Sequence, residues 1–368
     1  MERYDQLFRL YEEFDTDTLQ SYQEFVDLSP PVDSRVALDH WQNASEELEA
    51  RKDEIRSAFP QVGETFASVA ALATRDQAFA ALDLYSKDDR GVNVLVLDVD
   101  ETLRSAGNTD NEIPRETLHL LTRFHGEGIP IVICTGQTLE NVKGFLIQGL
   151  GNSMVHSGNV SIVYEAGTGV FTPGQGEATK QLLYENLDPD VQTVFSQVRG
   201  RVDLLEECVA DVVDGTHEGN GFARQYYAQQ DPEIRGVLET TGDAPETSPG
   251  DVPEPFREFF ERIDVAYYEA DAAEVGSLEL NKVVGVEAAL DVLGVDDPFA
   301  LIMGDSKSDL RVMEWADEHG AGIAAAPEHA SEDVLDHVTS TDDLVFDRGD
   351  AAEMLRTAYV LRRLAALD

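Results

Sequence analysis

The chain has 368 residues, with 72 acidic side chains (Asp and Glu) against 27 basic ones (Lys and Arg), a formal net charge of −45. Such a surface would repel nucleic-acid phosphates and anionic membranes, so the charge excludes nucleic-acid and membrane-surface binding proteins. The hydrophobic fraction of 42% indicates a folded chain with a very acidic surface. Because lysine is scarce as well as acid abundant, we favour a protein adapted to high salt over an acidic mesophilic one.

The compartment follows from cysteine use and from the absence of apolar runs. Two cysteines, Cys134 and Cys208, are too few for a disulfide framework, which fits a reducing compartment. The N-terminus has no apolar signal core, and no window approaches the roughly 18 apolar residues of a membrane span. We therefore expect a cytoplasmic protein.

Residues 1–90 read as a helical domain without a convincing strand. Leu7, Leu10 and Phe14 follow helical spacing, and Asp17 is the predicted N-cap of a second helix. Further helices are expected near 34–58 and 62–86. We expect this domain to serve packing or homo-oligomerisation, and it shows no residues arranged for chemistry.

The pattern changes at residue 91, where buried strands begin to alternate with helices. A nearly continuous apolar run at 92–97 ends at Asp98, as expected of a central parallel strand covered on both faces. The chain is therefore predicted to form a doubly wound parallel α/β sheet, built from residues 91–170 and 281–368. The elements expected there are strands at 92–97, 129–134, 154–156, 299–303 and 321–325, a hairpin at 160–171, and helices at 114–127, 138–148, 282–293, 308–318 and 350–366.

Residues 171–280 interrupt this alternation. A structureless loop of this length would be improbable, so we interpret the segment as an inserted α+β domain. Its expected strands are 265–269 and 275–280, and its expected helices are near 177–187 and 254–263.

Polar residues gather where the predicted strands end. In open α/β sheets the ligand binds beyond the carboxyl ends of the strands. Four carboxylates crowded there would repel one another unless a cation lay among them, and oxygen ligands favour a hard ion such as Mg²⁺. The residues at this edge are Asp98 and Asp100 after the first strand, Thr135 and Gly136 after the second, Lys282 at the start of a helix, and Asp305 and Asp309 after the strand at 299–303.

These residues resemble a known family. The segments DVDET at 98–102, Thr135-Gly136, Lys282 and GDSKSD at 304–309 are similar, in that order, to the four motifs of the haloacid dehalogenase superfamily. The resemblance covers about residues 92–368, and four ordered motifs are far more specific than one. The insertion resembles the type II cap of the superfamily, of the Cof-like IIB branch.

The resemblance implies a role for each residue. Asp98 would attack phosphorus to form an aspartyl-phosphate, and Asp100 would act as general acid and base. Lys282 would neutralise the nucleophile and the transferring phosphoryl group, while Thr135 and Gly136 would hold phosphate oxygens.

The resemblance also implies a Mg²⁺ site formed by Asp98, Asp100, Asp305 and Asp309. Asp100 would contribute its backbone carbonyl, and Asp309 would support the metal waters or Lys282. Asn159, after the expected third strand, is a further candidate for substrate binding, with a turn-forming role as its alternative.

The sequence therefore favours a Mg²⁺-dependent phosphatase acting on a small phosphorylated metabolite, such as a sugar phosphate or phosphoglycolate. One alternative is a phosphomutase that uses the same aspartyl-phosphate. Another is a non-catalytic phosphate-binding regulatory protein. A receiver-like signalling domain is disfavoured, because its phosphorylated Asp would follow the third strand rather than the first.

Overall fold

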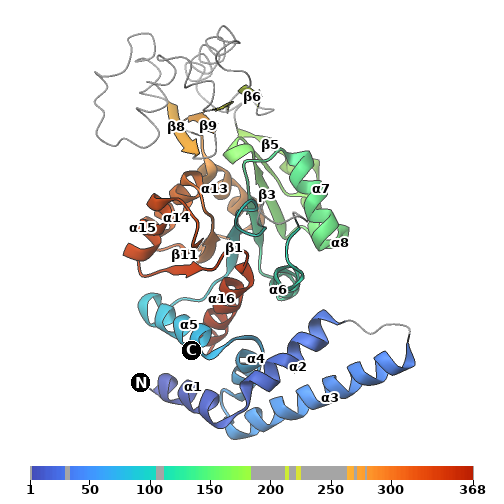
Figure 1. Cartoon of the computed structure of the whole chain (residues 1–368). Helices are drawn as coiled ribbons and strands as arrows, with labels where there is room; N and C mark the ends of the chain where they lie inside the picture. Colours follow the sequence, from blue (N-terminus) through green and yellow to red (C-terminus); the bar gives the residue numbers. More distant parts are fainter. Residues whose placement is uncertain are drawn as a thin grey trace.

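The computed structural model describes residues 2–29, 34–104, 112–183, 212–214, 221–224, 263–268, 272–277 and 280–367. An N-terminal layer of helices lies beneath an α/β core (Figure 1). Among the described residues, no helix is both long and apolar enough to span a membrane.

Five helices form the N-terminal layer. The predicted N-cap Asp17 is wrong: α2 is capped by Asp15, whose carboxylate accepts a hydrogen bond of 3.2 Å from the Thr18 N–H. The helix expected at 62–86 is two helices, because Thr74 forms a capping box with Gln77 and starts a new one. The helices are α1 (Glu2–Glu13), α2 (Thr16–Leu28), α3 (Arg35–Ala58), α4 (Gly63–Leu72) and α5 (Arg75–Asp88).

The core is an eight-stranded sheet in the order β12-β11-β10-β1-β2-β3-β4-β5. The strands from β12 to β3 run parallel, while β4 and β5 are antiparallel additions at one edge. This confirms the predicted doubly wound α/β class. The strands are β1 (Val94–Leu97), β2 (Ile131–Cys134), β3 (Val160–Tyr164), β4 (Gly169–Phe171), β5 (Gln181–Leu182), β10 (Ala300–Met303), β11 (Gly322–Pro327) and β12 (Leu344–Phe346).

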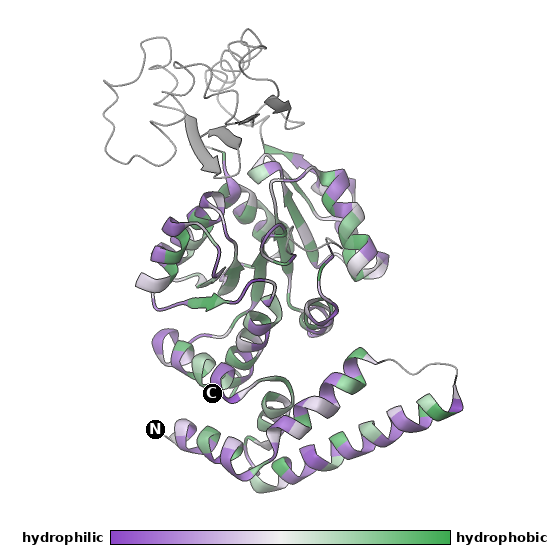
Figure 2. Ribbon diagram, in the orientation of Figure 1, coloured by the Kyte–Doolittle hydropathy of each residue, from purple (hydrophilic) through white to green (hydrophobic). Residues whose placement is uncertain are grey.

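Helices cover both faces of this sheet because successive strand residues point to opposite sides. Leu95 and Leu97 pack into a core with α6, α7 and α16, whereas Val94 and Val96 pack into a second core with α13, α14 and α15. Figure 2 shows the resulting hydrophobic strands between amphipathic helices. The helices are α6 (Arg115–Gly126), α7 (Leu139–Leu150), α8 (Asn152–Val155), α13 (Lys282–Leu293), α14 (Lys307–His319), α15 (Glu332–Ser340) and α16 (Ala351–Ala365), with short 3-10 turns η1 (Glu165–Gly167), η2 (Pro173–Gln175) and η3 (Glu177–Thr179).

The structure differs from the sequence-based expectation at several further points. The helix expected near 177–187 is wrong in its described part, where η3 and the strand β5 form instead. The strand expected at 154–156 is wrong, because these residues lie in and just after the short helix α8. The strand β12 was not expected, since its three residues are too few to form a recognisable pattern. The strand β5 still belongs to the large sheet, beyond residue 171 where the insertion was expected to begin.

The described parts of the inserted segment form a second, antiparallel sheet in the order β6-β7-β9-β8. The strands β8 and β9 correspond to those expected at 265–269 and 275–280. The strand β9 starts three residues earlier than expected. The helix expected near 254–263 lies outside the described residues apart from its last position, which begins a strand. The strands are β6 (Val212–Asp214), β7 (Gly221–Arg224), β8 (Ile263–Tyr268) and β9 (Ala272–Ser277).

The position of β1 decides where a ligand can bind. The chain runs from β1 outward through β2 and β3 on one side, and later through β10, β11 and β12 on the other. The strand order therefore reverses beside β1, and such a switch point opens a crevice at the carboxyl ends of the strands.

The close approach of α13 to the sheet yields a stability prediction. A Cβ added to Gly285 would lie 2.4 Å from Cγ1 of Val163, whereas one added to Gly144 in α7 would meet no atom within 4 Å. Gly285→Ala should therefore lower the free energy of unfolding by about 1–3 kcal/mol through overpacking. Gly144→Ala, the matched control, should raise it by up to about 1 kcal/mol through helix propensity. Denaturant unfolding in high salt measures both, and equal effects would contradict the packing argument.

Candidate active site

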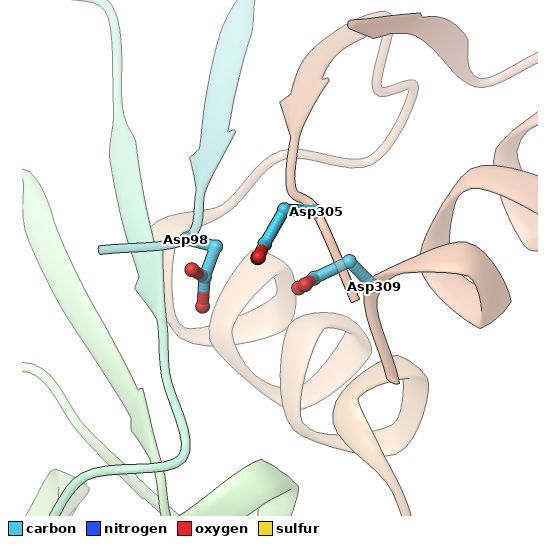
Figure 3. A group of neighbouring side chains, drawn as sticks. All are labelled: Asp98, Asp305 and Asp309. Atoms are coloured by element: carbon cyan, nitrogen blue, oxygen red, sulfur yellow. The ribbon is translucent and has the colours of Figure 1, made fainter. Parts of the chain in front are cut away.

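Three carboxylates meet at the carboxyl edge of the sheet. Asp98 directly follows β1, Asp305 lies two residues after β10, and Asp309 lies in the first turn of α14. Each offers an oxygen within 4.8 Å of the others, and Figure 3 shows the three side chains pointing toward one another. The Asp98 N–H continues the parallel pairing with a 2.9 Å hydrogen bond to the Met303 carbonyl, which holds two of these strand ends side by side.

Lys282 inserts its ammonium between two of these carboxylates. Its Nζ donates to Oδ1 of Asp98 at 3.0 Å and to Oδ1 of Asp309 at 2.6 Å, and the lysine is 3% exposed. Lys282 is the first residue of α13, and the Asn281 side chain caps this helix by accepting from the Val283 N–H. The cap therefore determines where α13 begins and so where the ammonium lies.

Asp309 is held from both sides. Its second oxygen, Oδ2, accepts from the Ser306 hydroxyl at 2.6 Å and from the Ser306 N–H at 3.2 Å. A Cβ on Gly304 would lie only 2.3 Å from Cβ of Asp309, so only glycine lets the aspartate approach the strand end. Both oxygens of Asp309 thus have donors, and its main effect is to orient Lys282.

Burial and charge perturb the site strongly. Burial acts against the charged form of Lys282, but Asp309 and Asp98 outweigh it and raise the lysine pKa well above its usual value. Burial raises the pKa of Asp98 well above its usual value despite Lys282, and burial with the Asp309 charge raises the pKa of Asp305 to about 7. Three clustered carboxylates with one ammonium, which contacts two of them, leave an excess of negative charge when they are ionised.

The residues present fit a divalent cation. The donors are all oxygens, they converge from separate elements, and the excess negative charge needs a positive ion. Asp98 and Asp305 are the carboxylates best suited to hold it, because Asp309 already accepts from Ser306 and Lys282. Oxygen ligands of this kind suit a hard divalent ion.

Asp100 lies apart from the cluster, with a carboxylate that is 43% exposed. Its Oδ1 accepts from Arg104 Nε at 3.0 Å and Nη2 at 2.7 Å, and its Oδ2 accepts from Gln137 Nε2 at 2.6 Å. The Arg104 guanidinium stacks 4.4 Å from the centre of the Phe145 ring. Among the described residues, the three hydrogen bonds to Asp100 all come from N–H donors.

Thr135 and Gly136 follow β2, next to the Asp98 strand end. Thr135 is fully buried and its Oγ1 accepts from the Gln137 N–H at 3.1 Å, while its backbone N–H pairs with the Val163 carbonyl at 2.9 Å. Gly136 is exposed, and a Cβ there would meet nothing within 4 Å. A side chain at position 136 would therefore have room.

The structure does not bring Asn159 to this edge. Its carbonyl accepts from the Ile131 N–H at 3.0 Å, which places it at the amino ends of β2 and β3, opposite the cluster. The turn that follows β3 at the carboxyl edge of the sheet is η1, where Glu165, Ala166 and Gly167 all have positive φ. Glu165 is buried, and burial raises its pKa to about 7. This turn lies inside the hairpin expected at 160–171.

Two residues that contact Asp100 had no role in the sequence-based prediction. Arg104 lies four positions after Asp100, and a tight turn with its N–H on the Val99 carbonyl carries it back. Gln137 directly follows the second motif, Thr135-Gly136. Spacing alone gave no signal for either contact.

Comparison with known proteins agrees with this geometry. The model of the haloacid dehalogenase-like hydrolases matches residues 95–343. A search of curated proteins found no match. A solved structure from Thermoplasma acidophilum shares 14% identity with a TM-score of 0.50, and the alignment covers 74% of this chain and 100% of that one.

Two further solved structures match with lower TM-scores. A Thermotoga maritima protein shares 15% identity with a TM-score of 0.48, over 74% of this chain and 97% of the other. A haloacid dehalogenase-like hydrolase from Bacteroides thetaiotaomicron shares 17% identity with a TM-score of 0.46, over 74% and 99%.

The family match spans most of the chain, and it begins in β1 and ends just before β12, so it includes every residue of the carboxylate cluster. This chain belongs to the haloacid dehalogenase-like hydrolase family.

Proposed function

We propose that the protein is a Mg²⁺-dependent phosphatase that hydrolyses a small phosphorylated metabolite through an aspartyl-phosphate. The observation that carries this proposal is the buried Lys282 ammonium shared by Asp98 and Asp309, with Asp305 beside them. A carboxylate nucleophile, a fixed cation and a place for a metal are the parts that phosphoryl transfer requires.

In this mechanism an oxygen of Asp98 attacks phosphorus and the leaving group departs on the opposite side. Lys282 stays protonated and offsets the charge that builds up on the nucleophile and the phosphoryl oxygens. Mg²⁺, held by Asp98 and Asp305, would neutralise phosphoryl oxygens and reduce their repulsion by the carboxylates. Thr135 and the Gly136 N–H would hold the phosphoryl group in line.

Asp100 would deliver a proton to the leaving oxygen and later take one from the attacking water. In the arrangement described, Arg104 and Gln137 donate to both of its oxygens. Asp100 must therefore give up at least one of these hydrogen bonds before it can carry a proton to the leaving group. Water attack on the aspartyl-phosphate then regenerates Asp98 and releases phosphate.

We propose that the enzyme works in the cytoplasm of a salt-accumulating cell. The net charge of −45 would repel an anionic substrate at low salt. At ~1 M salt the Debye length falls to about 3 Å, which removes this long-range repulsion. A panel of phosphorylated metabolites should therefore be assayed in molar salt, with and without Mg²⁺. If no phosphoester is cleaved under any of these conditions, the phosphatase proposal fails.

Asp98→Asn tests the nucleophile. The amide keeps the shape of the side chain but cannot attack phosphorus, so phosphate release should fall by about 10³-fold or more. The control is Asp291→Asn on the exposed side of α13, which should leave the rate unchanged. Steady-state phosphate release measures both, and wild-type turnover in the Asp98 variant would contradict the assignment.

Lys282→Met tests the buried ammonium. Removing it leaves Asp98 and Asp309 buried without their shared partner, which should lower the free energy of unfolding by about 3–5 kcal/mol. Turnover should fall by ~10²-fold or more, since a preorganised charge is lost. Unfolding in the presence and absence of Mg²⁺ should show a larger stabilisation by the ion in the variant. A stable variant with normal turnover would be inconsistent with this role.

The raised pKa of Asp305 predicts the pH dependence of metal binding. In the metal-free protein Asp305 takes up a proton as the pH falls through about 7. The protonated form is a poor ligand, so the Mg²⁺ affinity should fall by up to about tenfold per pH unit below that value. The folded state holds this extra proton, so the Asp305 contribution makes the metal-free fold less stable as the pH rises from about 4 to about 7.

Calorimetric titration with Mg²⁺ at several pH values measures the affinity and the protons released. Asp305→Asn should weaken binding and flatten its pH dependence. A Mg²⁺ affinity that stays constant as the pH falls below about 7 would contradict the raised pKa of Asp305.

A further inference from the structure

The helices α2 and α3 lie in the N-terminal helical layer (Figure 1). A groove lies between them. Its volume is about 1100 Å³. Its apolar lining comes from both helices: Tyr22, Phe25 and Leu28 from α2, and Ala37, Trp41 and Ala44 from α3.

The lining residues follow helical spacing on both helices. On α2 they recur at positions 18, 21, 22, 25 and 28 and at the C-cap Ser29, and on α3 at 37, 40, 41, 43, 44 and 47, so one side of each helix faces the groove. Phe25, which lines the groove, remains 41% exposed. Val36 and Leu38, near the start of α3 but outside the lining, are 66% and 38% exposed. A pair of helices with such a face can bury more apolar surface against a further helix.

The distribution of charge identifies the occupant. The two helices carry nine acidic residues, yet only Glu47 lines the groove, and Arg115 lies there as well. A basic partner would be attracted by acids around its docking site, whereas a partner that is itself strongly acidic requires their removal. The acidic residues that do not line the groove are Asp17, Glu24 and Asp27 on α2, and Asp39, Glu46, Glu49, Asp53 and Glu54 on α3.

We propose that this groove is the interface with a second copy of the chain, whose α2–α3 hairpin packs against the first to form a four-helix arrangement. A two-fold axis brings the same patch of each copy together, so one low-charge face suffices for both partners. Each copy carries a net charge of −45, and the copies can approach most closely where acids are absent. The inference is independent of the proposed phosphatase activity.

The mass in solution tests the interface. Sedimentation or light scattering of the full chain at about 100 µM should give a dimer in molar salt, because salt screens the repulsion between the copies. Lowering the salt should weaken the dimer. A monomer at every salt concentration would overturn the proposal, and so would a dimer that tightens at low salt, since that contact would be ionic.

Substitutions then locate the interface. Phe25→Asp on α2 and Ala37→Glu on α3 each place a charge in the groove and should weaken dimerisation by about 100-fold or more. Ala37 lies in the first turn of α3, where an acid favours the helix, so this variant should fold even if the other does not. Phosphatase activity, or far-UV circular dichroism if no substrate is found, reports folding.

Phe8→Asp is the matched control, because Phe8 is 49% exposed on α1 and does not line the groove. This variant should remain a dimer. If it dissociates while Ala37→Glu does not, the interface lies elsewhere in the helical layer and the proposal is overturned.

Discussion

A buried ammonium shared by two carboxylates holds the site together. Lys282 joins Asp98 and Asp309, which are 184 and 27 residues away in the sequence. These contacts tie the start of α13 to the end of β1 and the start of α14. Buried charges are stable only when they are paired, so this ion cluster and the sheet that places it depend on each other.

The acidic composition imposes one constraint at two places in the molecule. At the carboxyl edge of the sheet, three carboxylates cluster around a single lysine. The excess negative charge there favours binding of a cation. In the groove between α2 and α3, Glu47 is the one acidic residue of the two helices that contributes to the lining, which is largely apolar. The first arrangement supports the proposed phosphatase, and the second supports the proposed dimer.

The sequence predicted the site residues that closely follow a buried strand. It could not predict the residues whose position depends on the path of a turn. Asp98 and Asp305 follow buried apolar runs, so the parallel sheet brings them to one edge. Asn159 also lies beside a predicted strand, but the real strand begins after it, which moves the residue to the opposite edge. The contact of Arg104 with Asp100 depends on a tight turn that no periodicity records.

The sequence by itself determined the α/β class, the helical N-terminus and the order of the motifs, because these follow from hydrophobic periodicity and from residue types at strand ends. Only the tertiary structure decided which carboxylates share Lys282, which oxygens of Asp100 are already bonded, and which helix faces remain open. These depend on contacts between segments far apart in the chain, and such contacts are set by packing and by the direction of each side chain rather than by local spacing.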